Sequence, residues 1–236
     1  MASHTLTAMR NAVVAARCCL TRCCLTLSCL LVAGCGTTVP GAATWPGAAL
    51  TEAALGPSDF PPGVQYDRII ETPGQPDGAG APGPMLSRPP GCSDGLTKVI
   101  AQSAERGPGS AVKYAAGYDG ARIMVTLLSW NLDLEQLRAE ALRCAQFEAL
   151  FDFDSPGFPI TTTELAGLDP AALALQQTMP LEQAPNSVFM AFQNVGRQAA
   201  FAIAYPGPNP GIDAKATLPQ TFLDVFTQQI AKMRSS

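Results

Sequence analysis

Few residues in this chain have the types and spacing that enzymatic chemistry requires. The only histidine is His4, near the N-terminus. The rest of the chain therefore lacks the base of Ser-His-Asp and Cys-His catalysis and the imidazole ligands that zinc usually takes. No Gly-rich phosphate loop of either common type is present. Ser, Lys, carboxylate and Cys side chains remain as candidates.

Ser110 and Lys113 have the S-x-x-K spacing of penicillin-binding enzymes, in which the lysine assists a serine nucleophile. That motif opens a helix and is accompanied by S-D-N and K-T-G. Here a strand is predicted directly after Ser110, and both companions are missing. We therefore interpret the match as coincidental.

Asp152, Asp154 and Gly157 match the start of a calcium-binding loop. Pro156 occupies the third ligand position, and Thr163 stands where such a loop carries its last glutamate. The two acids also have the residue type of a glycosidase pair. We interpret them as solvated carboxylates, and the sequence predicts that the protein is not an enzyme and holds no metal or cofactor.

The segment Tyr205–Gly211, with three prolines, has two interpretations. It is either a rigid contact loop for a partner or a plain connector between a strand and a helix.

The N-terminal residues have the pattern of a secretory signal peptide. Arg10, Arg17 and Arg22 precede an apolar run at 23–32, and the small residues Ala33 and Gly34 follow. A membrane-spanning helix is the alternative, but it needs about 20 apolar residues, and this run is too short. We expect residues 1–34 to be removed on export, together with the cysteines they contain: Cys18, Cys19, Cys23, Cys24 and Cys29.

Residues Leu31–Cys35 resemble the lipobox of bacterial lipoproteins. The resemblance implies that Cys35 becomes the first residue of the mature chain and carries acyl chains. Two acyl chains hold a protein firmly on a membrane, whereas one does so only marginally. Residues 35–50, rich in small residues and proline, then read as a tether, and residues 51–236 as one domain.

The net charge of the expected mature chain argues against nucleic acid as a partner. Three of the fifteen basic residues and none of the nineteen acids precede Cys35, so the mature chain carries twelve bases against nineteen acids, a net charge of −7. An acidic domain has no electrostatic reason to bind nucleic acid.

Cys92 and Cys144 are the two cysteines that remain after Cys35. An even number of cysteines in an oxidising compartment indicates a disulfide, although two buried free thiols are the alternative. The bridge would close a loop of 53 residues between two predicted helices.

Hydrophobic periodicity predicts an α+β domain. The turn signal Asp119-Gly120 joins two apolar strands into a hairpin. Asp133 opens a helix with Gln136 three residues on, and 217–220 caps a last helix. Strands are expected at 64–70, 111–118, 121–130, 160–165, 173–181, 188–195 and 199–205, and a first helix at 92–105. Short turns between strands favour a two-layer fold, with a mainly antiparallel sheet of about 5–7 strands packed by about three helices.

The mature chain also resembles the small uncharacterised lipoproteins of mycobacteria and related actinobacteria. The residues that carry this resemblance are the lipobox, the Pro-rich tether, Asp59–Gly63 before the first strand and Pro90–Cys92 before the first helix. The architecture is more distantly similar to the extracellular sensor domains of mycobacterial Ser/Thr kinases, which implies ligand binding.

We therefore expect a non-enzymatic envelope lipoprotein on the outer face of the cell membrane, with a domain that binds a small ligand, a wall component or another envelope protein. The alternative is a lipid carrier whose apolar cavity is lined by the strand 121–130 and by Phe189, Phe192 and Phe201.

Overall fold

The computed structural model describes residues 46–70, 85–102, 109–180 and 186–236. The predicted signal peptide, Cys35 and most of the predicted tether lie outside these residues.

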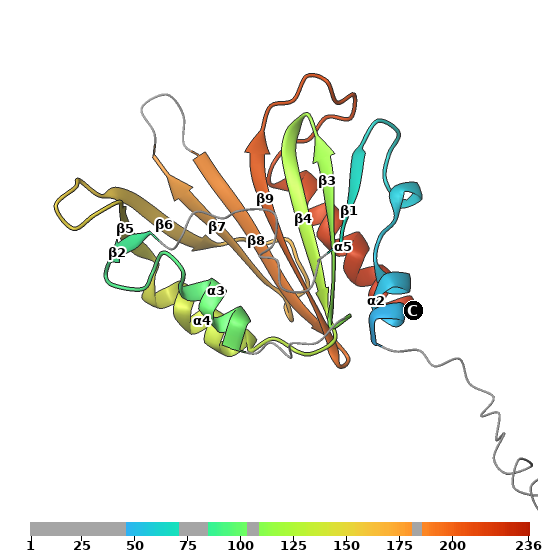
Figure 1. Ribbon diagram of the computed structural model, residues 1–236, viewed down its shortest axis with the longest axis horizontal. Coiled ribbons are helices and arrows are strands. Elements are labelled where there is room, and N and C mark those ends of the chain that lie inside the picture. Colours follow the sequence, from blue (N-terminus) through green and yellow to red (C-terminus); the bar gives the residue numbers. More distant parts are fainter. Residues whose placement is uncertain (1–45, 71–84, 103–108, 181–185) are drawn as a thin grey trace, which may run out of the picture. The chain divides into compact units, whose positions relative to one another are not determined.

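The domain is built on one antiparallel sheet of nine strands in the order β1-β3-β4-β9-β8-β7-β6-β5-β2 (Figure 1). The strands are β1 (Gln65–Ile69), β2 (Leu86–Arg88), β3 (Ala111–Tyr118), β4 (Gly120–Leu128), β5 (Gln146–Leu150), β6 (Phe158–Glu164), β7 (Leu173–Met179), β8 (Asn186–Val195) and β9 (Gln198–Gly207). The helices are α2 (Pro46–Ala53), α3 (Gly95–Gln102), α4 (Leu134–Arg143) and α5 (Gln220–Ser235), with a short 3-10 turn at Pro57–Asp59.

The α+β class and the antiparallel pairing are confirmed, but the predicted numbers of elements are too low. The described residues form nine strands and four α-helices. The prediction lacked β2, which has only three residues, and β5, which directly follows a helix. It also lacked α2, whose residues 46–50 had been assigned to the tether. Leu50 of this helix is fully buried, so the folded domain includes it.

Helices cover both faces of the sheet, and this corrects the expected two-layer arrangement. α2 and α5 pack on one face, which we call face A, over β3, β8 and β9. α3 and α4 pack together on the opposite face, face B, where α4 lies over β6 and β7 (Figure 1). Face A of the β5–β7 half and face B of the β1–β4 half therefore carry no helix in the described parts of the chain.

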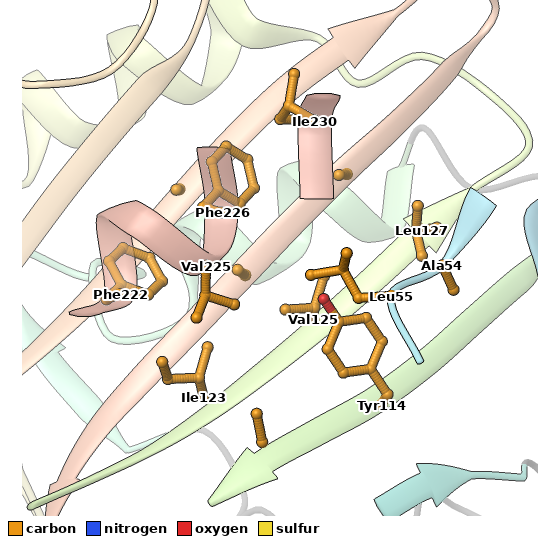
Figure 2. Packing of buried hydrophobic residues seen from close by; sticks show 14 of the residues in the cluster. Ala54, Leu55, Tyr114, Ile123, Val125, Leu127, Phe222, Val225, Phe226 and Ile230 are labelled. Atoms are coloured by element: carbon orange, nitrogen blue, oxygen red, sulfur yellow. The ribbon is translucent and has the colours of Figure 1, made fainter. Parts of the chain in front are cut away.

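Face A packs closely because β9 places small side chains on this face and the larger Phe201 and Ile203 on the other. Ala200, Ala202 and Ala204 of β9 all point to this face and are fully buried. Their small size lets the aromatic residues of α5 approach the sheet. Figure 2 shows Phe222 and Phe226 of α5 in this core. Burial of each such ring contributes about 1.5–3 kcal/mol.

Several local predictions are confirmed. Asp119 and Gly120 join β3 to β4, and Tyr118 pairs with Ala121. Asp133 caps α4, because its carboxylate accepts a hydrogen bond from the backbone N–H of Gln136 at 2.9 Å. The predicted apolar side of the last helix is buried at Phe222, Leu223, Phe226, Ile230 and Met233.

The cap of α5 differs from the prediction. α5 starts at Gln220, and no side chain caps it. The Thr217 backbone N–H instead donates to the Thr221 hydroxyl at 2.9 Å. Helix α3 begins at Gly95 rather than at Cys92 and is described as far as Gln102.

The disulfide between Cys92 and Cys144 is confirmed. Cys144 ends α4, and Cys92 lies between β2 and α3. Both cysteines are buried in a small cluster with Phe147 and Ala149 of β5. The bridge therefore fixes the β2 edge of the sheet and the start of α3 to the end of α4.

Candidate functional site

A cavity of about 230 Å³ opens on face B, over the β1–β4 half of the sheet, which none of the described helices covers. We call this cavity the trough. It lies between β1 and β4, above β3, and the chain after β9 closes one end. Its lining residues are Gln65, Asp67, Ala115, Gly117, Tyr118, Ala121, Arg122, Gly207, Pro208, Asn209 and Ile212.

The strand register explains why a hollow forms here. Gln65 and Asp67 of β1 pair with Gly117 and Ala115 of β3. Because side chains alternate along a strand, all four lie on the same face, and β3 contributes only a methyl group and a hydrogen atom. Arg122 of β4 pairs with Gly117 from the other side. The trough is thus a floor of small residues with Gln65 and Asp67 on one side and Arg122 on the other.

Gly117 leaves little spare room in this floor. A Cβ atom added there would lie 3.3 Å from Ile212 Cδ1 and 3.4 Å from Gln65 Cβ. The first distance is tighter than an ordinary contact, and the second lies at the lower limit of ordinary contacts. A side chain at this position would displace the wall and occupy part of the trough.

The segment after β9 is held in place by Asp119. Its carboxylate accepts a hydrogen bond from the Asn209 backbone N–H at 2.8 Å and pairs with the Lys215 ammonium group. The Lys215 hydrogen bond, followed by the Asn209 hydrogen bond, keeps the pKa of Asp119 below its usual value. The Asp119 backbone also bonds Ala214 and Ala216. Asn209 and Ile212 therefore keep fixed positions at the rim.

The trough carries two charged side chains of opposite sign. Asp67 on β1 and Arg122 on β4 are both exposed. Neither forms an ion pair or a side-chain hydrogen bond with the described residues around it. The side chain of Tyr118 packs in the core on face A, so its phenol adds no polar group to the trough. The arrangement can therefore hold an anionic group at one wall and a cationic or hydrogen-bond-donating group at the other.

The predicted contact segment Tyr205–Gly211 is divided between two structures. Its first residues extend β9, which ends at Gly207, and pair with β4. Pro208 and Asn209 lie at the rim of the trough. The segment leads from β9 toward α5, as the connector interpretation predicts, and contact with a partner stays a prediction.

The S-x-x-K match does not have the local structure that its chemistry requires. Ser110 directly precedes β3, and Lys113 is the third residue of that strand. The motif needs a helix, which would place the two side chains one turn apart. On an extended chain, residues three apart point to opposite faces.

Asp152 and Asp154 lie in the exposed connection between β5 and β6. The Asp154 backbone N–H donates to the Asp152 carboxylate at 3.0 Å, and the Asp152 N–H donates to the Ser155 hydroxyl at 3.2 Å. The acids thus stabilise their own turn. Among the residues that the structure describes, no group of three or more His, Cys, Asp and Glu side chains could hold a metal ion.

The aromatic residues expected to line a lipid cavity do not share one surface. Phe189 points to face A and packs against Phe222 of α5, with ring centroids 6.3 Å apart. Phe192 and Phe201 point to face B and stack on each other, also at 6.3 Å. Strand β4 likewise divides its apolar side chains between the two faces.

Asp67 and Arg122 were not identified by sequence reasoning. Both look like ordinary polar positions on the solvent face of a strand. One signal was present: Ala115 and Gly117 lie on one face of β3, whereas the opposite face carries the large residues Tyr114 and Tyr118. Small residues on one face of a strand can indicate a close approach or a hollow.

None of the helices in the part of the chain that the structure describes is long and apolar enough to cross a membrane.

The fold defines an α+β protein with a single antiparallel sheet and helices on both faces. A structural comparison finds similarity to an uncharacterised protein from Mycobacterium smegmatis, described as an Rv0999 ortholog. The two share 15% sequence identity with a TM-score of 0.42, and the match covers 80% of this chain and 95% of the other. No protein-family model matches the chain, and no curated protein matches it.

Proposed function

We propose that this protein is a non-enzymatic envelope lipoprotein that binds a small molecule in the trough. The observation that carries the proposal is a cavity of about 230 Å³ with Asp67 and Arg122 on opposite walls, neither of which pairs with another of the described side chains. Ligand sites are concave and place a few polar groups to orient what they bind. The lipobox resemblance supports an anchor at Cys35, which would hold the domain on the outer face of the membrane.

Stabilisation by ligand tests the binding proposal. The full chain, purified from the membrane of an actinobacterial host, is unfolded thermally with and without small soluble fragments of digested cell wall. A ligand at one hundred times its Kd stabilises a protein by about 2.7 kcal/mol. We expect a rise in the unfolding temperature for the wild type.

Two tryptophan variants locate the effect. Gln65→Trp fills the trough from the exposed face of β1, and Thr161→Trp adds the same ring to the exposed face of β6. We expect Gln65→Trp to abolish the shift and Thr161→Trp to keep it. An equal response of both variants, or no shift in any of the three proteins, would contradict binding in the trough.

The anchor has its own test. Cys35→Ala removes the thiol that would be acylated, so we expect the variant to remain uncleaved or to leave the membrane fraction. Cell fractionation with gel migration measures both. A variant that fractionates and migrates like the wild type would refute the lipoprotein assignment and leave the trough proposal intact.

A further inference from the structure

The two charges of the trough are separated by a distance that the sheet fixes. β1 and β4 are both neighbours of β3, so Asp67 and Arg122 stand two strand spacings apart, about 10 Å. Asp67 pairs with Ala115 and Arg122 with Gly117, which adds an offset of two residues, about 7 Å, along the strands. The two charged groups thus lie diagonally across the small-residue floor.

Asp67 and Arg122 supply the charges of the trough lining. Among the described residues they are the only charged side chains in the lining, and Asp119 and Lys215 at the rim pair with each other. The cavity is therefore neutral as a whole but strongly dipolar. A simple anion would be attracted by Arg122 but repelled by Asp67. A simple cation would be attracted by Asp67 but repelled by Arg122. Electrostatic complementarity favours a ligand that is itself neutral overall and carries one charge of each sign.

The chemistry of each wall defines the two ends of such a ligand. Arg122 carries a planar guanidinium group, which matches a carboxylate with two parallel hydrogen bonds. Asp67 accepts hydrogen bonds only, so it matches a protonated amine. The side-chain amides of Gln65 and Asn209 can both donate to and accept from an uncharged amide between these ends. Ala115 offers a methyl group to any short aliphatic part.

The size of the trough limits the ligand further. Sites for drug-sized ligands measure roughly 300–1,000 Å³. The trough, at about 230 Å³, is smaller. We infer that it takes a small zwitterion with a free amine at one end, a free carboxylate at the other and an amide between them: a dipeptide-sized fragment. This inference rests on the proposed function and assigns the chemical class of its ligand.

Blocked dipeptides separate the two ends experimentally. Isothermal titration calorimetry on the full chain compares alanyl-alanine, its C-terminal amide and its N-acetyl derivative. We expect the free dipeptide to bind with a Kd of about 1 mM or tighter. Each blocked form should bind about tenfold more weakly, because it leaves one charged wall without a partner.

Variants then assign each end to one residue. Arg122→Gln should remove the preference for a free carboxylate over the amide and keep the preference for a free amine. Asp67→Asn should do the converse. Arg197→Gln and Glu52→Gln change exposed charges outside the trough and should keep both preferences.

The failures of the two proposals can be told apart. If the blocked dipeptides bind as tightly as the free one, or if none binds, the zwitterion class is overturned. If Gln65→Trp still abolishes stabilisation by wall fragments in that case, the trough remains a binding site for another ligand. If Gln65→Trp has no effect either, both proposals fail.

Discussion

At the scale of single residues, Gly120 shows how a turn prediction becomes a packing requirement. Its φ of +107° lies in the region that only glycine adopts readily. A Cβ atom added there would also lie 2.8 Å from the Ala216 carbonyl oxygen. The β3–β4 turn therefore meets the chain that leads into α5 at a point where no side chain fits.

Gly120→Ala should destabilise the protein by about 1–3 kcal/mol, because it combines backbone strain with a clash against a carbonyl group. Urea denaturation measures the change. Gly196→Ala is the matched control, since Gly196 also has a positive φ of 60° but has nothing within 4 Å of an added Cβ. The control should lose about 1 kcal/mol or less. If both variants lost the same free energy of unfolding, the close approach to Ala216 would not contribute to the effect of Gly120→Ala.

Asp59 is the residue whose charge links the start of the domain to its end. Its carboxylate binds the Lys232 ammonium group of α5 at 2.7 Å and the Gly56 backbone N–H, also at 2.7 Å. The hydrogen bond from Lys232, followed by that from Gly56, holds the pKa of Asp59 below its ordinary value. The ionised form is thus stabilised more in the folded than in the unfolded chain.

A lowered pKa gives stability that is fully present above the unfolded-state value, about 3.9, and is lost as the pH falls through the folded-state value. Asp59→Asn should therefore be less stable than the wild type at pH 6, and the difference should narrow as the pH falls from about 4 to about 2. Urea denaturation across this range measures it, with Glu52→Gln on the exposed side of α2 as the control. A difference that stays constant with pH would contradict the assigned role of the charge.

At the scale of elements, the disulfide compensates for a short strand. β2 has three residues and pairs only with β5 at the edge of the sheet. Cys92 follows it closely, and its bond to Cys144 holds this edge against the end of α4. Arg143 adds hydrogen bonds to the carbonyl oxygens of Pro90 and Gly91 at 3.3 and 3.4 Å.

Removal of the bridge should cost about 2–5 kcal/mol. The double variant Cys92→Ser/Cys144→Ser tests this by denaturation, and the intact protein should weigh 2 Da less than its reduced form, since a disulfide lacks two hydrogen atoms. Two free thiols titrated in the unfolded wild type would exclude the bridge.

The sequence predicted elements well where a single rule decides them. The hairpin at Asp119-Gly120 and the cap at Asp133 depend on local chemistry, and both were right. β2 and α2 could not be predicted in this way, because β2 is too short for a periodicity and α2 lies in a stretch rich in small residues. Their formation depends on partners distant in sequence, β5 for the strand and α5 for the helix.

The candidate site was less accessible to sequence reasoning than the fold. The trough exists because β1 and β4 lie on either side of β3 and because a segment after β9 closes one end. Strand order cannot be predicted from periodicity. The sequence therefore could not show that Asp67 and Arg122 lie diagonally across β3. Only the rim segment around Asn209 was identified beforehand.

At the scale of the whole molecule, Gln229 joins the first helix to the last. It is fully buried in α5. Its carbonyl oxygen accepts from the Leu55 N–H and the Tyr114 hydroxyl, each at 3.0 Å, and its NH2 group donates to the Ala53 carbonyl at 2.8 Å. One side chain thus satisfies the end of α2 and a buried phenol on β3 together.

Gln229→Ala should destabilise the domain by about 2–4 kcal/mol, because it leaves a cavity and buried polar groups without partners. Gln228→Ala, which removes only an exposed hydrogen bond to the Asp59 carbonyl, should lose less than about 1 kcal/mol. Thermal and urea denaturation of the two neighbours give the comparison. Similar losses would mean that the buried network contributes no more than a surface contact.

The position of β9 in the sheet has a consequence for folding kinetics. β9 pairs with β4 in the middle of the sheet, and the partners Gly120 and Gly207 are far apart in the sequence. The chain loses conformational entropy when this long loop closes, and this loss precedes the stabilisation that pairing of β4 with β9 gives the sheet. This pairing adds non-local contacts to the sheet, so we expect folding in milliseconds to seconds rather than microseconds. Before β9 has paired, β4 and β8 lack the strand that lies between them, so their edges and apolar side chains are exposed. A truncated chain that ends before residue 198 should therefore be prone to aggregation.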